Sequence, residues 1–474
     1  KICSESGASA VYWNKEHTPE SRLRDTERKR VLAAESSEKD HVAIVVECQS
    51  SLLYDPERVS LASGFNGGHW GTLMPFLKGC QKQFGEPRRP AAKHETFAIL
   101  ESMKGPSKWP AGVDVDQLDM AVIKGNHKWD VPILERFPMS EDAASETLKE
   151  FFTQGFSRYE TERSRADLEW STSKLSAHLR IGTLSPNELY HKTHDSGLPY
   201  GDTKIFSRRL IWRDLAYYQL YAFPSMRDQP IRKHYESTEW VTGDEELRRL
   251  EAWKWGETGY PIVDAGMREL YATGWMTQSI RMIVASFLVE YLRVNWVKGC
   301  EWFHYTLVDA DSAINPMMWN NAGRSGIDQW NFVLSPENAS QDGTGEYTKK
   351  WVPELAGLSR PLIHKPWQAP KEVLERAGVV LGKTYPHRIV KDLKEERQHS
   401  VDSVLKMRRS AQEYNDKRGY DIITLPNGEN TVVFTKKEYR IDGEGNLMKG
   451  IGKISNRVGK SKRRRRQCIN EKLG

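Results

Sequence analysis

A cluster of short hydroxyl side chains is the first group of residues with clear chemical potential. Ser171, Thr172, Ser173 and Ser176 lie together with Lys174, directly before a stretch with helical periodicity. Hydroxyls and the free N–H groups at the start of a helix donate hydrogen bonds to phosphate oxygens at little entropic cost. The cluster therefore fits a pyrophosphate, while the same residue types also serve as an ordinary helix N-cap.

A second group combines acidic, amide and indole side chains. Asp311, Asn315 and Trp319 lie four residues apart, the spacing that places side chains on one helical face. Pro316 fits only the first turn of a helix, so Asn315 is a candidate N-cap whose side chain turns toward a ligand. Either geometry leaves Trp319 one turn further along the chain.

Composition sets the class of protein that must position these residues. The chain has 474 residues, with 38% apolar and 28% charged side chains, which is enough for two or three domains with a sizeable core. The longest apolar stretch is too short to span a bilayer, so we expect no membrane insertion. Five scattered cysteines without paired spacing argue against a disulfide scaffold and against a metal site.

The order of predicted elements indicates an α/β part followed by a helical part. Residues 8–55 read as strand, helix and strand, residues 86–128 are rich in Pro, Lys and Gly, and the pattern is helical beyond Pro138. Apolar residues between Thr277 and Leu292 recur at three- and four-residue spacing, which predicts a buried helix. We therefore divide the chain into a partial α/β domain (1–85), a linker (86–137), a helical domain (138–413) and a basic C-terminal tail that we expect to be flexible (414–474).

Three long stretches are similar to one known family. The FAD-binding half of cryptochromes and DNA photolyases resembles residues 157–190, 253–296 and 307–332 of this chain. The segment PELAGLSRPLIHKPWQAP follows them, and the match runs to about Pro386. GASAVYWNKEHTPESRLRD and SLLYDPERV resemble the later part of the family's Rossmann-like antenna domain, whose opening strands are missing here. The resemblance implies a partial α/β antenna domain followed by a large helical FAD-binding domain.

The resemblance assigns FAD ligands position by position. It places Arg281 and Asp309 as an ion pair beside the isoalloxazine, with Asp311 nearby and Asn315 facing the flavin N5. Arg281 would stabilise the negative charge that appears on one-electron reduction. Without the surrounding motif, the pair would be interpreted as a plain buried salt bridge. The implied cofactor ligands are Tyr159, Ser171, Thr172, Ser173, Lys174, Ser176, Phe206, Arg213, Gln278, Arg281, Asp309, Asp311 and Asn315.

Several of the sixteen tryptophans fall where the family moves electrons. The resemblance makes Trp319 the inner and Trp296 the middle member of a chain that passes electrons to the photoexcited flavin, with Trp240 as the candidate outer member. Because tryptophan also fills protein cores, core packing is the alternative for each of them.

Residues expected near a DNA lesion give conflicting indications of function. Trp212, Met282 and Asn315 match the types found in enzymes that repair pyrimidine dimers. Against repair, Arg209 stands where those enzymes bond the dimer with an acidic residue, and Asn321 replaces a lesion-facing tryptophan. A donor in place of an acceptor should cost about 2–5 kcal/mol of binding in a desolvated pocket.

These departures favour a plant-like cryptochrome, an FAD-dependent blue-light photoreceptor. The first alternative is a pyrimidine-dimer photolyase, a carbon–carbon lyase, and the second is a light-independent DNA-binding protein on the same fold. The sequence further suggests a second antenna chromophore, such as the folate MTHF, and unidentified signalling partners. DNA would bind through the flavin cavity or the basic tail, whose run Lys460–Arg466 is also typical of a nuclear-import signal or a solvated segment. We expect a nuclear or cytoplasmic location, with an organelle left open because the chain begins at Lys1 rather than Met.

Overall fold

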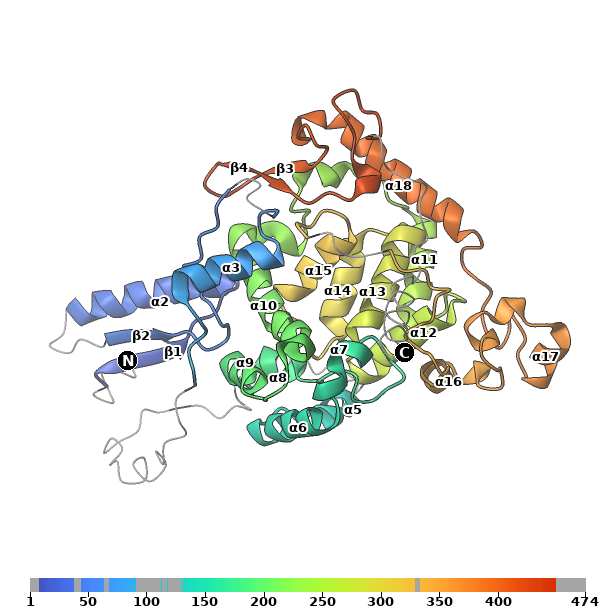
Figure 1. Cartoon of the computed structure of the whole chain (residues 1–474), viewed down its shortest axis with the longest axis horizontal. Coiled ribbons are helices and arrows are strands. Elements are labelled where there is room, and N and C mark those ends of the chain that lie inside the picture. Colours follow the sequence, from blue (N-terminus) through green and yellow to red (C-terminus); the bar gives the residue numbers. More distant parts are fainter. Residues whose placement is uncertain are drawn as a thin grey trace, which may run out of the picture.

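The computed structural model describes residues 8–37, 44–63, 68–90, 131–328 and 333–448, together with the single residues 112, 117 and 129. A small α/β lobe lies at one side of a large helical body, and a short hairpin lies against the body at another edge (Figure 1). Within these described residues, no helix is both long and apolar enough to cross a membrane.

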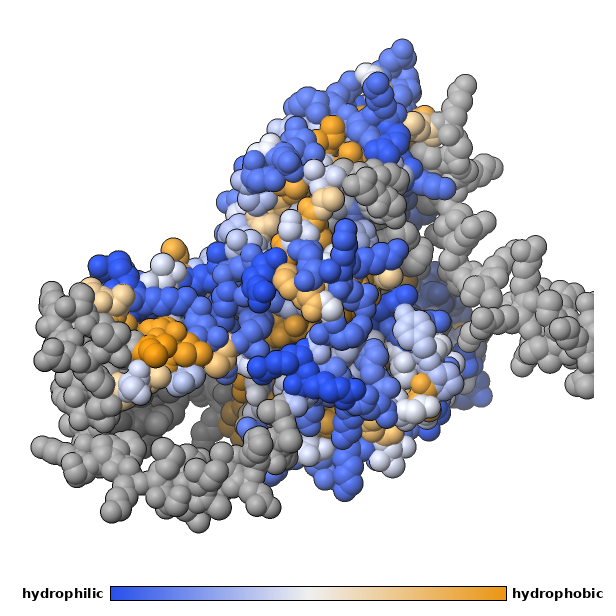
Figure 2. All heavy atoms as spheres, turned by 60° about the vertical axis from the view of Figure 1, so that its left-hand side comes forward, coloured by the Kyte–Doolittle hydropathy of each residue, from blue (hydrophilic) through white to orange (hydrophobic). Residues whose placement is uncertain are grey.

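The α/β lobe consists of β1 (Ala10–Asn14), α2 (Pro19–Ser37) and β2 (Ile44–Cys48). The two strands pair in parallel, as expected for strands joined by a helical crossover. Tyr12 and Ile44 are 67% and 63% exposed, and Figure 2 shows apolar side chains gathered on this lobe. The strand, helix and strand predicted for this region are thus present.

The helical body carries most of the chain. Its α-helices are α3 (Leu73–Phe84), α5 (Val131–Arg136), α6 (Glu141–Gln154), α7 (Tyr159–Glu162), α8 (Ser176–Ile181), α9 (Pro186–His194), α10 (Tyr200–Ala222), α11 (Asp244–Trp255), α12 (Pro261–Thr273), α13 (Gln278–Ser286), α14 (Trp296–Thr306), α15 (Ile314–Ala322), α16 (Glu346–Trp351), α17 (Lys371–Arg376) and α18 (Leu393–Ser410). Most of the segment expected to be a linker, residues 91–130, lies outside the described residues.

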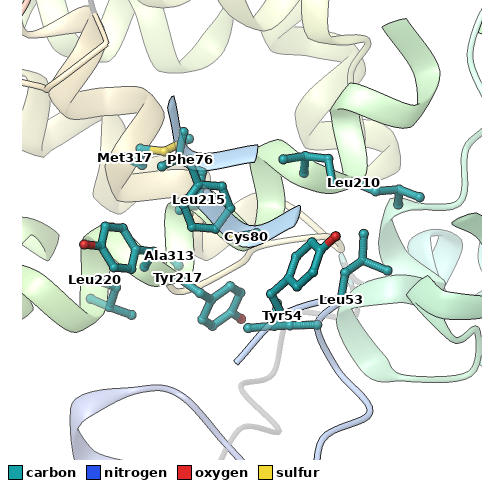
Figure 3. Packing of buried hydrophobic residues seen from close by; sticks show 14 of the residues in the cluster. Leu53, Tyr54, Phe76, Cys80, Leu210, Leu215, Tyr217, Leu220, Ala313 and Met317 are labelled. Atoms are coloured by element: carbon teal, nitrogen blue, oxygen red, sulfur yellow. The ribbon is translucent and has the colours of Figure 1, made fainter. Parts of the chain in front are cut away.

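Helix α10 is the central helix of one of the two large apolar cores. Its buried Leu210, Leu215 and Leu220 pack with Phe76 of α3 and Met317 of α15 (Figure 3). The α/β side of the molecule and the helical body therefore share one core around α10. The second core surrounds α12, α13 and α14.

The predicted apolar stripe between Thr277 and Leu292 is buried, as expected. It runs through α13 and continues into a π-helical turn, η7 (Phe287–Tyr291). Ile280, Ile283, Phe287 and Leu288 are all fully buried. Because a π turn changes the angular phase of the helix, the charged Glu290 is also brought inside, with 2% of its surface exposed.

The described part of the expected C-terminal tail, residues 414–448, is folded, in contrast to the flexibility expected from its composition. β3 (Asp421–Thr424) and β4 (Asn430–Val433) form an antiparallel hairpin, followed by the short 3-10 turn η12 (Lys437–Tyr439). Asp421 is fully buried and binds Arg232 and Arg408 of the helical body. A charge paired across two segments has no signature in local composition, which explains the difference. Residues 449–474, with the basic run, lie outside the described residues.

Candidate functional site

A deep cavity lies between α7, α8, α10, α13, α14 and α15. Its volume is about 290 Å³ for the centres of water molecules. The walls contain 33 residues, and the polar ones come from segments far apart in the sequence. Those expected to bind a ligand or DNA are Tyr159, Thr172, Ser173, Lys174, Ser176, Phe206, Arg209, Arg213, Gln278, Arg281, Met282, Asp309, Asp311, Asn315, Trp319 and Asn321.

Four expected site residues do not line this cavity. Ser171 is buried, and its hydroxyl donates to the carbonyl oxygen of Arg165 at 2.6 Å. Trp212 is partly buried and packs against the core around α10. Trp296 and Trp240 lie behind the cavity wall, in and beside the second core. The ligand and lesion contacts expected of Ser171 and Trp212 remain predictions.

The hydroxyl cluster forms an irregular turn before α8. Lys174 has a φ of 57°, a left-handed conformation that bends the chain here. The Ser173 hydroxyl accepts from the N–H of Leu175 at 3.4 Å, and the Ser176 hydroxyl accepts from the Trp275 indole at 3.4 Å. The Thr172 hydroxyl is buried without a hydrogen-bond partner within the described residues. A buried hydroxyl that lacks a partner is costly, so this wall fits the phosphate oxygens of FAD.

The expected ion pair of the flavin site is present. Nη2 of Arg281 donates to both carboxylate oxygens of Asp309, at 2.9 and 3.1 Å, and Nε donates to the carbonyl of Met276 at 2.8 Å. Nη1 has no partner among the described residues and remains for a ligand. The carboxylate of Asp309 limits the desolvation cost of the guanidinium, because an unpaired buried charge is strongly destabilising.

Asp311, and not Asn315, caps helix α15. One oxygen of Asp311 accepts from the N–H groups of Ala313 and Ile314, at 2.8 and 2.9 Å, and the other accepts from the Tyr217 hydroxyl at 3.1 Å. The N-cap role predicted for Asn315 is thus wrong: Asn315 already lies in the first turn of α15, where its Nδ2 donates to the carbonyl of Cys300 at 3.0 Å. Its other side-chain atom, the carbonyl oxygen, remains for a ligand.

Titratable groups around the cavity keep fixed charge states. Burial raises the pKa of the Tyr217 phenol well above its ordinary value, so it stays a donor to Asp311. Burial alone would raise the pKa of Glu290, but the nearby Arg397 and Arg324 outweigh it and lower this pKa to about 2. Glu290 is therefore ionised and paired at neutral pH.

Of the three tryptophans, Trp319 lines the cavity, and Trp296 and Trp240 do not. Trp319 is buried in the cavity wall, and its ring centroid is 5.0 Å from Phe303 and 6.1 Å from Trp253. Trp296 is buried at the start of α14, where a Cβ at Gly323 would come within 2.3 Å of its ring. Trp240 is partly buried beneath the Arg324 guanidinium, 5.0 Å from its ring centroid. The electron-transfer roles of the three remain predictions.

Sequence reasoning missed several residues of the cavity. Arg180 and Trp275 fall inside the stretches that carry the family resemblance, so a fuller comparison of those stretches could have found them. Glu290 and Lys436 also line the cavity, yet neither belongs to a chemical motif. Their positions result from the π turn and from the folded C-terminal segment.

Comparisons with known proteins agree with this geometry. Residues 206–406 match a family described as the FAD binding domain of DNA photolyase. A deoxyribodipyrimidine photo-lyase of Agrobacterium fabrum is 34% identical over 395 residues, covering 82% of this chain and 78% of that protein. Cryptochrome-1 of Arabidopsis thaliana is 30% identical over 406 residues, covering 82% of this chain and 56% of the relative.

Solved structures give the same result. A bacterial class III photolyase from Agrobacterium tumefaciens superposes with a TM-score of 0.75 and 32% sequence identity, covering 86% of this chain and 81% of that chain. The similarity thus covers most of the chain.

Proposed function

Because the chain belongs to the DNA photolyase/cryptochrome family and carries its FAD-binding domain, we propose that it is a light-driven photolyase for pyrimidine dimers in DNA. This places repair ahead of the photoreceptor function that the sequence favoured. The observation that carries the proposal is that the cavity is lined by Met282 and Asn321 in addition to the expected flavin ligands.

Met282 and Asn321 give the cavity an apolar surface and an amide that an extruded pyrimidine pair can contact. Met282 offers a flexible apolar surface for the bases. Asn321 is 2% exposed, and its side-chain Oδ1 is buried without a hydrogen-bond partner within the described residues. Pyrimidine edges carry both carbonyl acceptors and an N–H donor, which an amide can satisfy. An enzyme that acts on bases must take them out of the stack into such a pocket.

The remaining residues hold and orient the reactants. FAD, when bound, supplies light-driven one-electron chemistry. Thr172, Ser173 and Lys174 would hold its phosphates, and Arg281 would place a fixed positive charge beside the ring system. Trp319 lies in the wall as the side chain best placed to donate an electron from the protein.

A blue-light photoreceptor is the second candidate, and Arg209 favours it. This side chain lines the cavity where dimer-repair enzymes would place an acceptor, and cryptochromes are among the relatives of the chain. In that case the altered cavity would respond to light without processing DNA.

A repair assay separates the two functions. FAD-loaded protein would be illuminated with blue light in the presence of a thymine-dimer oligonucleotide, single- and double-stranded, and restored thymine would be quantified after strand separation. We expect light-dependent restoration, with no product in the dark or with flavin-free protein. Absence of repair in a preparation whose flavin is still reduced by light would favour the photoreceptor.

A further inference from the structure

The folded C-terminal segment, residues 414–448, contributes a side chain to the flavin cavity. Lys436, which follows β4 and precedes the turn η12, lines the cavity together with Glu290, Asn321 and Val333. Asn321, which lines the same cavity, belongs to the proposed pyrimidine site. A residue that composition placed in a flexible tail therefore faces the ligand.

The backbone on both sides of Lys436 is held in place. The Thr435 hydroxyl accepts from the N–H of Asp421 at 2.9 Å and donates to its carboxylate at 3.2 Å. On the other side, the N–H of the fully buried Tyr439 donates to the carbonyl of Lys436 at 3.0 Å. The backbone that bears the Lys436 side chain is thus held by hydrogen bonds on both sides.

The charge of Lys436 acts on Glu290 through space and helps to lower its pKa, but the direct partners of Glu290 are other groups. Glu290, the acidic residue nearest in the cavity wall, is already bound by Arg397 at 3.2 Å, by Arg324 at 3.5 Å and by the Ser400 hydroxyl at 2.5 Å. Glu438 is bound by Arg397. Within the part of the chain that the structure describes, the ammonium of Lys436 makes no hydrogen bond or ion pair. Burial lowers the pKa of Lys436, while Glu290 and Glu438 oppose this effect.

Arg209 is a second cation of the cavity, and its side chain is exposed. It lines the same cavity from α10, and among the described residues its guanidinium has no hydrogen-bond or salt-bridge partner. A neutral base offers neither cation an ion-pair partner, whereas an anionic group that enters the cavity with the base would pair with both. Every extruded nucleotide brings such a group, because its sugar is joined to backbone phosphates.

We propose that Lys436 is a substrate-binding residue that contacts a backbone phosphate of the extruded nucleotide, with Arg209 of α10 contacting a second backbone phosphate. The inference rests on the proposed repair function, and it changes the meaning of Arg209. Instead of a mismatch at the base edge, Arg209 becomes a contact to the nucleic-acid backbone.

The test compares charged and uncharged ligands in the dark. FAD-loaded full chain would be titrated with a short single strand that contains one thymine dimer, and with the same strand carrying neutral methylphosphonate linkages around the dimer. Lys436→Met should weaken binding of the charged strand about tenfold. It should also reduce the salt dependence, the slope of log K against log salt, by about 0.7, the value for one lost phosphate contact on a single strand. Binding of the neutral strand should not change.

Two variants control for structural damage. Lys437→Met removes the neighbouring exposed lysine and should leave both affinities unchanged. Lys436→Arg keeps the charge and should retain most of the affinity for the charged strand. Equal losses for both strands, or an unchanged affinity of Lys436→Met for the charged strand, would overturn the inference.

Further titrations identify the source of the phosphate. They also distinguish failure of this inference from failure of the proposed repair function. Inorganic phosphate or a free nucleoside diphosphate that binds with the same dependence on Lys436, while the charged strand does not, would overturn assignment to nucleic acid. Absence of repair, combined with Lys436-dependent binding of a dimer-free strand, would reject the repair function and leave the phosphate site intact.

Discussion

Two buried polar clusters of this protein differ in how many internal partners they have. The Asp421 carboxylate, fully buried beside the hairpin, accepts from Arg232, Arg408, Tyr235 and His234, as well as from Thr435. Around the flavin cavity, Arg281 binds Asp309 and the Met276 carbonyl, while the Thr172 hydroxyl and the Lys436 ammonium have no hydrogen-bond partner in the described chain.

The difference separates structural from ligand-binding polarity. A low-dielectric interior strengthens a satisfied network and penalises an unsatisfied one. The Asp421 cluster satisfies its carboxylate internally and so fastens residues 414–448 to the helical body. The cavity leaves polar groups open, and a ligand must supply their partners. Variants of the two clusters should therefore fail in different ways.

Removing the charge of Asp421 should have the largest effect on the fold. Asp421→Asn leaves the buried Arg232 and Arg408 without their shared counter-charge, and we expect a loss of about 3–5 kcal/mol in the free energy of unfolding. Urea unfolding followed by circular dichroism measures it. Asp402→Asn, at an exposed position of α18, should change stability by less than about 0.5 kcal/mol. A similarly small change in Asp421→Asn would show that the cluster is not a structural fastening.

Glu290 shares a feature with each cluster: it lines the flavin cavity, and its carboxylate is fully paired. Its pKa, about 2 in the folded protein, is below the ordinary value of 4.5. Its ionised form therefore stabilises the fold at pH values above 4.5, and this contribution is lost as the pH falls from 4.5 toward 2. Glu290→Gln should cost about 3 kcal/mol at pH 7.

The measurement is urea unfolding of wild type and variant at pH 7 and at several values below 4.5. The difference between them should shrink as the pH falls. Glu301→Gln, an exposed position on α14, serves as the matched control and should show no such dependence. A difference that stays constant down to pH 3 would contradict the assignment of an ionised, paired Glu290.

A Trp319 variant tests whether a side chain of the cavity wall donates the electron to the flavin. Trp319→Phe should keep FAD bound, because the ring still fills the wall, but light-driven flavin reduction should fall by at least about tenfold, since phenylalanine is much harder to oxidise than the tryptophan indole. Trp296→Phe should show a weaker effect. The readout is the rate of loss of oxidised-flavin absorbance under blue light, with Trp351→Phe as a control outside the cavity. An unchanged rate in Trp319→Phe would mean that electrons enter by another route.

Arg209 gives the smallest expected effect and the finest distinction. If it contacts a backbone phosphate, Arg209→Glu should weaken dimer-containing and undamaged strands alike, by several-fold, because phosphate contacts carry no base information. If the arginine instead blocks a base edge, the same change should improve discrimination for the dimer. Fluorescence titration of both strands decides between these outcomes.

Long motifs made the family and most of the site predictable from sequence. The hydroxyls from Thr172 to Ser176, Arg281, Asp309 and Asn315 belong to stretches whose order along the chain is tied to one ligand, and the structure brings them together in one cavity. The buried stripe of α13 was predictable for a different reason, since helical periodicity is a local property.

Only the tertiary structure decided the partners of charged residues. Asp421 reads as a solvated acid in a Gly- and Lys-rich segment, yet it meets Arg232 from 189 positions away. Lys436 reads as part of a basic tail, yet its backbone is held so that its side chain reaches the flavin cavity. Composition and spacing describe neighbours along the chain, whereas the free energy of a buried charge depends on neighbours in space, which the sequence specifies only through the completed fold.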